Sequence, residues 1–361
     1  MSVESASPGP QRLRAQVAVI VGQPGIGDMV WHQPALAAIA RRHGGPVCLF
    51  ARPSTQAAAL FEASPDVAEV VAFDRGRGAG LLPALTDLTL KLRQGRFERC
   101  YVLSQRSSLA LAAAMAGVPQ RLGFGGGGQR GLLNCGQGLT DDETRAVSGG
   151  PVVECHQFLV RNGLPAPEAA PALAASSAAR AAVRIRFAAA PRPWIALGVS
   201  ANEDDRRWIP RRFAELARRL ERRCGGTVFL YGGPHHAGQI DQVLERLPER
   251  AERIVDLSRQ ALPFDQVMAL LAESNLFIGN DSGPLNLAAA LGIPAYGLFG
   301  GAAPHASLSP RIRAILPAVG EPDLESGMER LTVDHVLDCV EPALPTGAAG
   351  LDARLGFSSS L

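Results

Sequence analysis

Short apolar runs alternate along the chain with segments whose apolar residues recur every three or four positions. In the first half, four runs rich in β-branched residues predict strands: QVAVIVG, PVCLFAR, VAEVVAF and RCYVLS. Helical patterns separate them, from about Pro34 to His43, from Ser54, around residues 81–94, and in SSLALAAAMAG. This alternation predicts a parallel sheet with helices on both faces.

A second alternation of the same kind fills the second half of the chain. The first alternation ends in a predicted Gly-rich loop between residues 125 and 150. The segment HQFLVRNGL then predicts a short helix that ends at Gly163. Residues 166–193 are rich in Ala and Pro with little periodicity, which is typical of an interdomain linker. Five strands with intervening helices follow: WIALGVS, TVFLYGG, RIVDLS, LFIGND and PAYGLFG.

The two alternations predict an α/β protein with two Rossmann-like domains. We expect domains at residues 15–165 and 194–345, with a disordered tail at 1–14 and a loose tail at 346–361. A chain of 361 residues is long enough for about two domains. Ligands of such sheets bind at the carboxyl ends of the strands, so we expect a central cleft that the two sheets face.

Composition and charge exclude several classes of function. The chain is 47% hydrophobic and only 5% aromatic, which favours helix-on-sheet layers. With a formal charge of only +2, the chain lacks the strong positive potential that is typical of nucleic-acid-binding proteins. Lys91 is the only lysine, so arginine would take any role that relatives give to lysine.

The six cysteines and the apolar runs indicate the compartment. No CxxC pair occurs, so we expect reduced thiols and no metal or redox site. The N-terminus lacks an apolar signal core, and no run approaches the ~18 apolar residues of a membrane span. We therefore expect a cytoplasmic protein that could touch a membrane surface.

The Gly-rich turn GQPGIGD resembles a dinucleotide fingerprint only weakly. Gly22, Gly25 and Gly27 do not give G-x-G-x-x-G, and no acidic residue ends the second strand. A dehydrogenase is therefore disfavoured.

Asp28, which ends this Gly-rich turn, is either the N-cap of the following helix or a group that moves a proton. Because Pro34 prefers a first helical turn, either the helix starts near His32 and Asp28 precedes it, or its first turn is distorted.

A second polar turn, GNDSGP, joins a strand to an Ala-rich helix. Asn280, Asp281, Ser282 and Gly283 form this turn, whose free N–H groups would cradle a diphosphate. The alternative is that Asp281 or Ser282 simply caps the helix.

Charged residues in NEDDRRWIP follow another strand. Arg206 or Arg207 could clamp a phosphate, whereas Asp204 and Asp205 are too few for a magnesium site and are more typical of a solvated charge run. Neighbouring His235 and His236 in GGPHHAG are ligand contacts or surface histidines.

These segments, taken in order, resemble glycosyltransferase family 9, the ADP-heptose:lipopolysaccharide heptosyltransferases. The resemblance runs over about residues 16–300 and is most specific in GNDSGPLNLAAALGIPAYGLFG. PGIGDMVWHQPALAAIARR, RRWIPRRFAELARRL and YGGPHH are similar to further family motifs. The resemblance implies the GT-B fold, with an N-terminal acceptor domain and a C-terminal nucleotide-sugar domain, and an inverting reaction without bound metal or cofactor.

The resemblance also implies roles for single residues. Asp28 would be the general base for the acceptor hydroxyl, and Arg206, in the place of a family lysine, would hold the donor diphosphate. The remaining expected donor contacts are Ser200, Gly233, His235, Asp281, Ser282, Gly283 and Asn286. Expected acceptor contacts are Gly27, Arg52 and Arg106; each of the two arginines could instead be an ordinary surface residue.

Two departures from the family pattern affect the donor side. Asn286 stands where the family has histidine, and His235 or His236 stands where an acidic residue is common. The leading interpretation is transfer of a sugar, heptose from ADP-heptose, to a lipid-linked saccharide at the inner membrane surface, without nucleic acid as a partner. The alternatives are a non-catalytic sugar-nucleotide-binding protein, a GT-B enzyme with a different nucleotide sugar, and an epimerase of the same fold.

Overall fold

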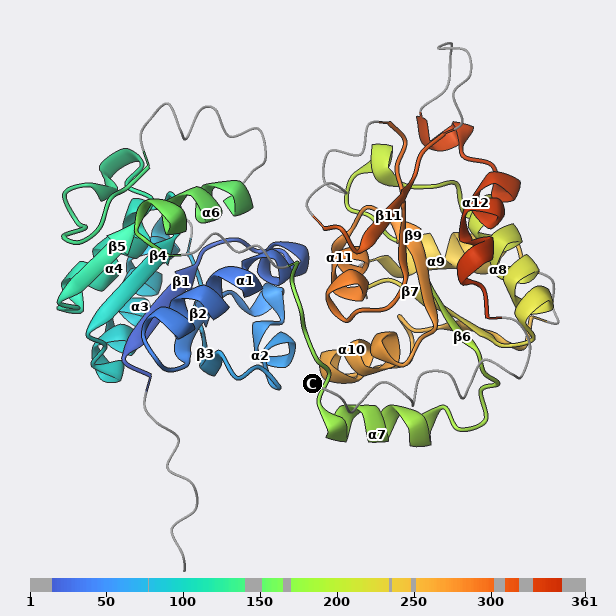
Figure 1. The fold of residues 1–361 in the computed structure, drawn as a ribbon, viewed down its shortest axis with the longest axis horizontal. Helices are drawn as coiled ribbons and strands as arrows, with labels where there is room; N and C mark the ends of the chain where they lie inside the picture. Colours follow the sequence, from blue (N-terminus) through green and yellow to red (C-terminus); the bar gives the residue numbers. More distant parts are fainter. Residues whose placement is uncertain are drawn as a thin grey trace, which may run out of the picture. The chain divides into compact units, whose positions relative to one another are not determined.

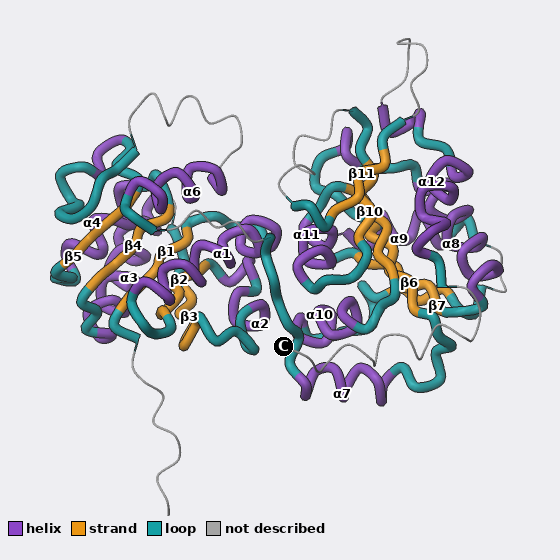
Figure 2. Tube along the Cα trace, in the orientation of Figure 1, coloured by secondary structure: helices purple, strands orange, loops and turns teal. Residues whose placement is uncertain are grey.

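The chain consists of two compact units, Met1–Glu168 and Ala169–Leu361. The structure is a computed structural model, shown in Figures 1 and 2. It describes residues 15–76, 78–139, 151–164, 170–233, 236–247, 251–301, 309–317 and 327–345. Each unit contains one parallel sheet with helices around it, as the alternating pattern predicts.

The first unit has a five-stranded sheet in the order β3-β2-β1-β4-β5. All four predicted strands are present, and the fifth, β5, is one the pattern missed because it is short and begins with Gln120 and Arg121. The strands are β1 Val17–Val21, β2 Val47–Ala51, β3 Val67–Ala72, β4 Arg99–Leu103 and β5 Gln120–Gly123. The α-helices are α1 Ile26–Arg42, α2 Ala57–Leu60, α3 Leu81–Gly95, α4 Ser107–Met115 and α6 Pro151–Arg161.

Helix α1 begins eight residues earlier than the sequence predicts. It starts at Ile26 and continues through Pro34 to Arg42. Pro34 lacks the N–H that would bond to the carbonyl of Val30. The buried side of α1 includes Met29, Val30, Leu36 and Ile39, and this packing holds the helix together across the missing bond. The expectation of a start near Pro34, or near His32, was therefore wrong.

Even-numbered residues of β1, β2 and β4 point to one face of the first sheet. There they form a core with α3 and α4, which pack against each other. The buried members are Ala18, Ile20, Cys48, Phe50, Cys100, Val102, Leu88, Leu92, Leu109 and Ala112. Helix α1 packs against α6. This packing fixes the loops that follow β1 and β4.

The second unit has a six-stranded parallel sheet in the order β11-β10-β9-β6-β7-β8, the doubly wound order of dinucleotide-binding domains. The five predicted strands are present, and β11 and α12 are additional. The strands are β6 Trp194–Gly198, β7 Thr227–Tyr231, β8 Ile254–Asp256, β9 Leu276–Asn280, β10 Ala295–Leu298 and β11 Ile312–Ile315. The α-helices are α7 Ser177–Arg186, α8 Pro210–Cys224, α9 Ala237–Leu244, α10 Phe264–Ala272, α11 Gly283–Ala290 and α12 Val333–Val340.

Helix α7 lies inside the segment predicted to be an Ala- and Pro-rich interdomain linker. Ser176 caps it by accepting a hydrogen bond from the Ala179 amide at 3.3 Å, and Ala and Arg are good helix formers. The helix packs against α10 of the second unit. Part of the predicted linker, Ser177–Arg186, is therefore helical, which its low periodicity did not indicate.

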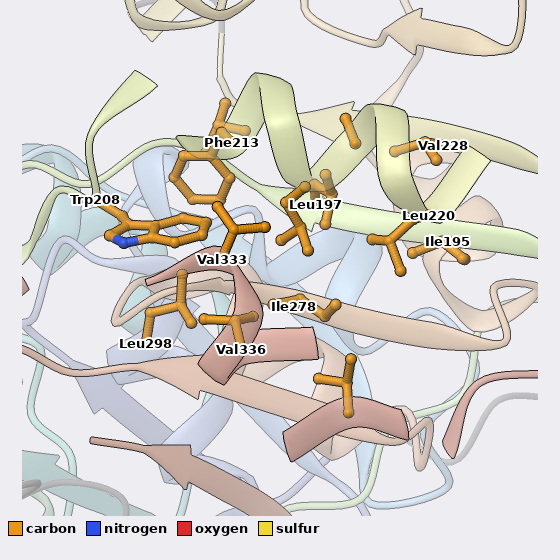
Figure 3. Packing of buried hydrophobic residues seen from close by; sticks show 14 of the residues in the cluster. Ile195, Leu197, Trp208, Phe213, Leu220, Val228, Ile278, Leu298, Val333 and Val336 are labelled. Atoms are coloured by element: carbon orange, nitrogen blue, oxygen red, sulfur yellow. The ribbon is translucent and has the colours of Figure 1, made fainter. Parts of the chain in front are cut away.

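The core of the second unit lies where α8 and α12 cover β6 and β9. Figure 3 shows its large side chains, with Trp208 and Phe213 beside Val333. The Trp208 and Phe213 rings are edge to face at 5.0 Å between centroids. Because Trp208 is only 1% exposed, it anchors the loop that carries the neighbouring arginines.

Candidate functional site

Each sheet has one place where its strand order reverses, between β1 and β4 in the first unit and between β6 and β9 in the second. Loops at the carboxyl ends of such strands are the usual ligand-binding positions of α/β sheets. Four predicted site residues lie in the loops or first helical turns that follow these strands: Asp28, Arg106, Ser200 and Asp281.

The turn after β9 leads into the N-terminus of α11. Ser282 is the N-cap residue with an extended backbone, but its side chain does not cap the helix. Its hydroxyl instead donates to the Asn280 carbonyl at 3.1 Å. The Asn286 amide donates to the Ser282 carbonyl at 3.4 Å. The alternative of a side-chain cap for Ser282 or Asp281 is thus wrong, and the α11 N-terminus keeps its partial positive charge without a capping side chain.

Arg206 reaches this turn, whereas Arg207 does not. The Arg206 guanidinium lies 3.4 Å from the Asp281 carboxylate and 2.8 Å from that of Glu203. Arg207 pairs with Asp204, three residues earlier. Of the two arginines that the sequence left open, the geometry therefore favours Arg206 as the cation beside the α11 N-terminus.

Asn280 holds the loops of this site together, a role that the sequence did not assign. Its side chain is fully buried, accepts from the Trp208 amide at 3.1 Å and donates to the Val199 carbonyl at 3.0 Å. It thereby ties the end of β9 to the loop after β6 and to the residue two positions after Arg206. The sequence signal for this role is an asparagine at the end of an apolar strand, because a buried side-chain amide requires hydrogen-bond partners.

Glycines bring β6 and β9 unusually close at the point where the order reverses. Gly198 pairs with Gly279, and a Cβ added to Gly279 would lie 2.7 Å from the Gly198 backbone. A side chain at Gly279 would push the two strands apart, and one at Gly198 would collide with the Phe277 ring. Ser200, which follows β6, is therefore held next to the β9 turn and is only 4% exposed.

Two further expected donor residues lie at the end of β7. Gly233 follows this strand, and a Cβ there would make an ordinary contact of 3.6 Å with the His236 ring. The His236 ring in turn lies 3.0 Å from the Asn202 side chain, in the loop after β6. His235 is outside the described residues. The two described residues thus lie beside the loop that carries Ser200.

In the first unit, Asp28 lies in the first turn of α1 but does not cap it. Gly25 is the N-cap residue, and no side chain bonds to the free N–H groups there. The Asp28 carboxylate folds back over Gly25, so that a Cβ added to Gly25 would lie 2.8 Å from Oδ2. Within the described part of the chain this carboxylate has no hydrogen-bond or ion-pair partner. The capping alternative is wrong, and Asp28 is geometrically able to accept a proton.

His32, one helical turn after Asp28, is a buried group that sequence reasoning missed. It is 1% exposed, and its Nδ1 donates to the Asp28 carbonyl at 2.7 Å. Burial lowers its pKa, although the Asp28 carbonyl and carboxylate oppose this shift. His156 on α6 also has a lowered pKa, through burial and then through His32. Both shifts favour the neutral form of the imidazole ring.

Arg52 and Arg106 lie on either side of β1 at the carboxyl edge of the first sheet. Arg52 follows β2 and is partly exposed, and Arg106 follows β4 and is exposed. Neither guanidinium has a partner among the described residues. Gly27 precedes Asp28 in α1. The two arginines and Asp28 therefore share one edge, with positive charge flanking the carboxylate.

No three His, Cys, Asp or Glu side chains gather as a metal site anywhere in the described ranges. In the same ranges, none of the helices has the length and apolarity needed to cross a membrane.

Comparison with known proteins identifies the family. The sequence model of glycosyltransferase family 9 (heptosyltransferase) matches residues 85–319, which is more than half of the chain. The chain belongs to glycosyltransferase family 9. It is a glycosyltransferase, and its two Rossmann-like units are those of the GT-B fold. The matched range includes Arg206 and the β9 turn and begins after Asp28.

Individual members of the family agree with this assignment. The chain is 26% identical over 318 residues to lipopolysaccharide heptosyltransferase 2 of Escherichia coli (strain K12), covering 86% of this chain and 90% of the relative. The solved E. coli ADP-heptose lps heptosyltransferase II has a TM-score of 0.75 at 25% identity, over 91% of this chain and 98% of that chain. A family 9 structure from Veillonella parvula has a TM-score of 0.76 at 15% identity, over 92% and 98% of the chains, and supports the fold.

Proposed function

We propose that this glycosyltransferase moves heptose from ADP-heptose to a hydroxyl of a lipopolysaccharide-core or other lipid-linked saccharide, with inversion and without a bound metal. We place the reaction at the inner face of the cytoplasmic membrane. The proposal is supported by the relatives named above, whose names specify lipopolysaccharide and ADP-heptose. The observation that carries it is the placement of Arg206 beside Asp281 and the uncapped N-terminus of α11.

The donor residues match the needs of a departing nucleoside diphosphate. When the bond between the anomeric carbon and the diphosphate oxygen breaks, negative charge grows on that diphosphate. The Arg206 guanidinium and the first N–H groups of α11 would stabilise this charge. Asp281 would otherwise repel a diphosphate, and its pairing with Arg206 reduces that repulsion.

The acceptor residues match the other half of the reaction. The acceptor oxygen forms the new bond to the anomeric carbon from the face opposite the diphosphate, and its proton passes to the Asp28 carboxylate. The carboxylate has both oxygens available because it neither caps α1 nor pairs with a cation among the described residues. Arg52 and Arg106 would meet anionic groups of the acceptor, since guanidinium groups bind carboxylates and phosphates in a bidentate manner.

Asn286 supports a second candidate, a non-catalytic protein that binds a sugar nucleotide. Where the family pattern has histidine, this side chain donates to the Ser282 carbonyl. It preserves a neutral hydrogen-bond donor near the proposed diphosphate site but has no titratable group. Binding without turnover is the result that would favour this candidate.

The proposed function is tested by a donor screen followed by product analysis. Ligand at about 100 times its dissociation constant adds about 2.7 kcal/mol to the stability, so ADP-heptose should raise the melting temperature above that with UDP- or GDP-sugars. Mass spectrometry should then show one heptose added to a heptose-deficient core saccharide, and NMR should show the inverted anomer. Stabilisation by a different nucleotide sugar would show that ADP-heptose is not the donor. Stabilisation without any product would favour the non-catalytic candidate.

A further inference from the structure

We propose that the exposed tip of α3, residues 81–83, docks on an anionic phospholipid surface and so brings the acceptor edge of the first unit to the membrane. The inference rests on the proposed function, because it concerns how a lipid-linked acceptor reaches Asp28. Three observations carry it: exposed leucines, their position at the sheet edge, and the charges around them.

The tip consists of apolar residues that the fold does not cover. Leu81 is 43% exposed and Leu82 is 72% exposed, and Pro83 is also exposed. The first turn of α3 contains no acidic residue, although acidic side chains are favoured at that position of a helix. The buried residues of this helix, Leu88 and Leu92, come later and pack in the core. The exposed leucines therefore contribute nothing to that core.

The tip projects beyond the carboxyl edge of the sheet. Lys91 Nζ donates to the carbonyl of Ala72, the last residue of β3, at 2.9 Å. Leu81 lies ten residues before Lys91, and ten helical residues span about 15 Å, much more than a lysine side chain can reach. Because α3 runs back along the sheet toward β4, its first residues extend past the end of β3. This is the edge at which Asp28, Arg52 and Arg106 lie.

The charges at this edge complement an anionic surface. Asp87, the acidic residue of α3 nearest the tip, is paired with Lys91 at 2.7 Å. Among the described residues, basic side chains follow most strands of the sheet, and acidic ones at this edge are fewer. The basic residues are Arg52, Arg75, Arg106 and Arg130, and the acidic ones are Asp28, Asp74 and Glu154, whose carboxylate accepts from Gln105 at 3.2 Å. Apolar side chains beside arginines are the composition by which peripheral proteins bind anionic lipid.

Only two leucines are available for insertion, so we expect weak and reversible binding. Such binding requires both the apolar contact and the electrostatic attraction, and it should weaken as salt increases. A bilayer contacted by the tip would hold the lipid part of an acceptor, while its saccharide would extend along the edge toward Asp28. The tip is thus a docking surface and takes no part in the chemistry.

The experiment is flotation of the full chain with vesicles that contain neither saccharide nor nucleotide sugar. Vesicles of phosphatidylcholine alone are compared with vesicles in which about a third of the lipid is phosphatidylglycerol. We expect wild type to bind the anionic vesicles preferentially. The double variant Leu81→Ser with Leu82→Ser should need about ten times more anionic lipid for half binding. The control Met115→Ser with Ile185→Ser, at positions that are 56% and 78% exposed, should bind like wild type.

Equal binding by wild type and the leucine variant would overturn the proposal. So would a leucine variant whose vesicle binding is unchanged while its oligomeric state changes in size-exclusion chromatography, since the tip would then contact a second copy of the chain. Turnover of a delipidated, water-soluble acceptor is measured in parallel and should be the same for wild type and the leucine variant. If neither wild type nor the leucine variant turned over the acceptor, while wild type still bound the anionic vesicles preferentially, the proposed function would be rejected and the docking surface would be retained.

Discussion

The Arg206 guanidinium lies 3.4 Å from the Asp281 carboxylate, and this contact joins the loop after β6 to the turn after β9. Asp281 alone would oppose a diphosphate at the α11 N-terminus. Arg206 both neutralises this carboxylate and presents N–H donors on the same side, because its Nε also pairs with Glu203 and fixes the side chain. This pairing is how an acidic residue would be compatible with the proposed site for an anionic donor.

Replacing Arg206 should therefore harm the donor half of the reaction. We expect Arg206→Ala to lower kcat/KM for the nucleotide sugar by roughly 10²- to 10³-fold, the cost of removing one donor that stabilises developing charge. Arg206→Lys should retain much of the activity, since it preserves the charge. Arg211→Ala is the matched control, because Arg211 is exposed and has no partner among the described residues. An Arg206→Ala enzyme as active as the control would exclude Arg206 from the site.

Removing the Asp28 carboxylate should abolish most of the chemistry and leave donor binding intact. Asp28→Asn keeps the shape of the side chain but cannot accept the proton, so we expect kcat to fall by roughly 10²- to 10⁴-fold. The proposed donor residues belong to the second unit, so the dissociation constant for the nucleotide sugar should not change. The control is Glu62→Gln, which removes an exposed carboxylate from the same unit. Turnover near that of wild type in folded Asp28→Asn would show that another group is the base.

Gly25 should matter because of the space that Asp28 occupies. A Cβ in Gly25→Ala would lie 2.8 Å from Oδ2 of Asp28 and would displace the carboxylate. We expect kcat to fall by about tenfold or more, with a stability loss of about 1 kcal/mol because alanine is a poor N-cap residue. Gly45→Ala, which would contact nothing within 4 Å, should change neither quantity. Equal kcat values for the two variants would show that the position of the Asp28 carboxylate is not critical.

Strands could be predicted from the sequence where their own residues are apolar and β-branched. Four β-branched apolar runs gave β1 to β4, whereas β5 begins with Gln120 and Arg121 and is a strand only because it pairs with β4. Pro34 led to a late start for α1, since a local rule about proline gave way to the packing of the buried side of the helix. In α7, the low periodicity hid a helix that packs against α10.

The candidate site was predictable to the same extent. Asp28, Arg206 and Asp281 could be proposed from the sequence because each comes after an apolar strand and carries a charged side chain. Asn280 and His32 could not, because their roles depend on partners and burial supplied by other parts of the fold. Asn280 bonds to Trp208, 72 positions away, and His32 is buried on a helix that packs against α6. Tertiary structure, and not local pattern, turns these two side chains into supports of the site.

Glu273 should be important for the stability of the second unit. Its side chain is 7% exposed and pairs with Arg180 at 2.6 Å, Arg184 at 2.9 Å and Arg192 at 3.2 Å. Burial alone would raise its pKa, but the hydrogen bonds from Arg184 and Arg180 and the positive charges of these arginines together outweigh burial and hold the pKa below its usual value of 4.5. This stabilisation is present above that value and is lost as the pH falls through the lower folded pKa.

Glu273→Gln should therefore reduce the free energy of unfolding at pH 7. We expect a loss of about 1–2 kcal/mol, discounted because the three guanidinium groups are partly exposed. Urea denaturation measures it, and Glu245→Gln is the control, since Glu245 forms only a 3.9 Å surface pair with Arg246. The two variants should differ less at pH 3 than at pH 7. A constant difference between those pH values would show that the charge of Glu273 does not account for the effect.

His32 should make the stability of the first unit depend on pH in the neutral range. Its folded pKa is lowered from 6.5 by burial, so below about pH 6.5 the unfolded chain binds protons that the folded chain does not. The free energy of unfolding should thus fall as the pH decreases from 7 toward the lowered pKa, and His156 should add to this trend.

His32→Leu removes one of the two groups and should flatten the slope of unfolding free energy against pH between 7 and 5. At pH 7 its stability should stay within about 1 kcal/mol of wild type, because the lost hydrogen bond is offset by removal of a buried ring nitrogen that has no partner. Identical slopes in urea titrations of wild type and His32→Leu would mean that His32 titrates equally in the folded and unfolded chains.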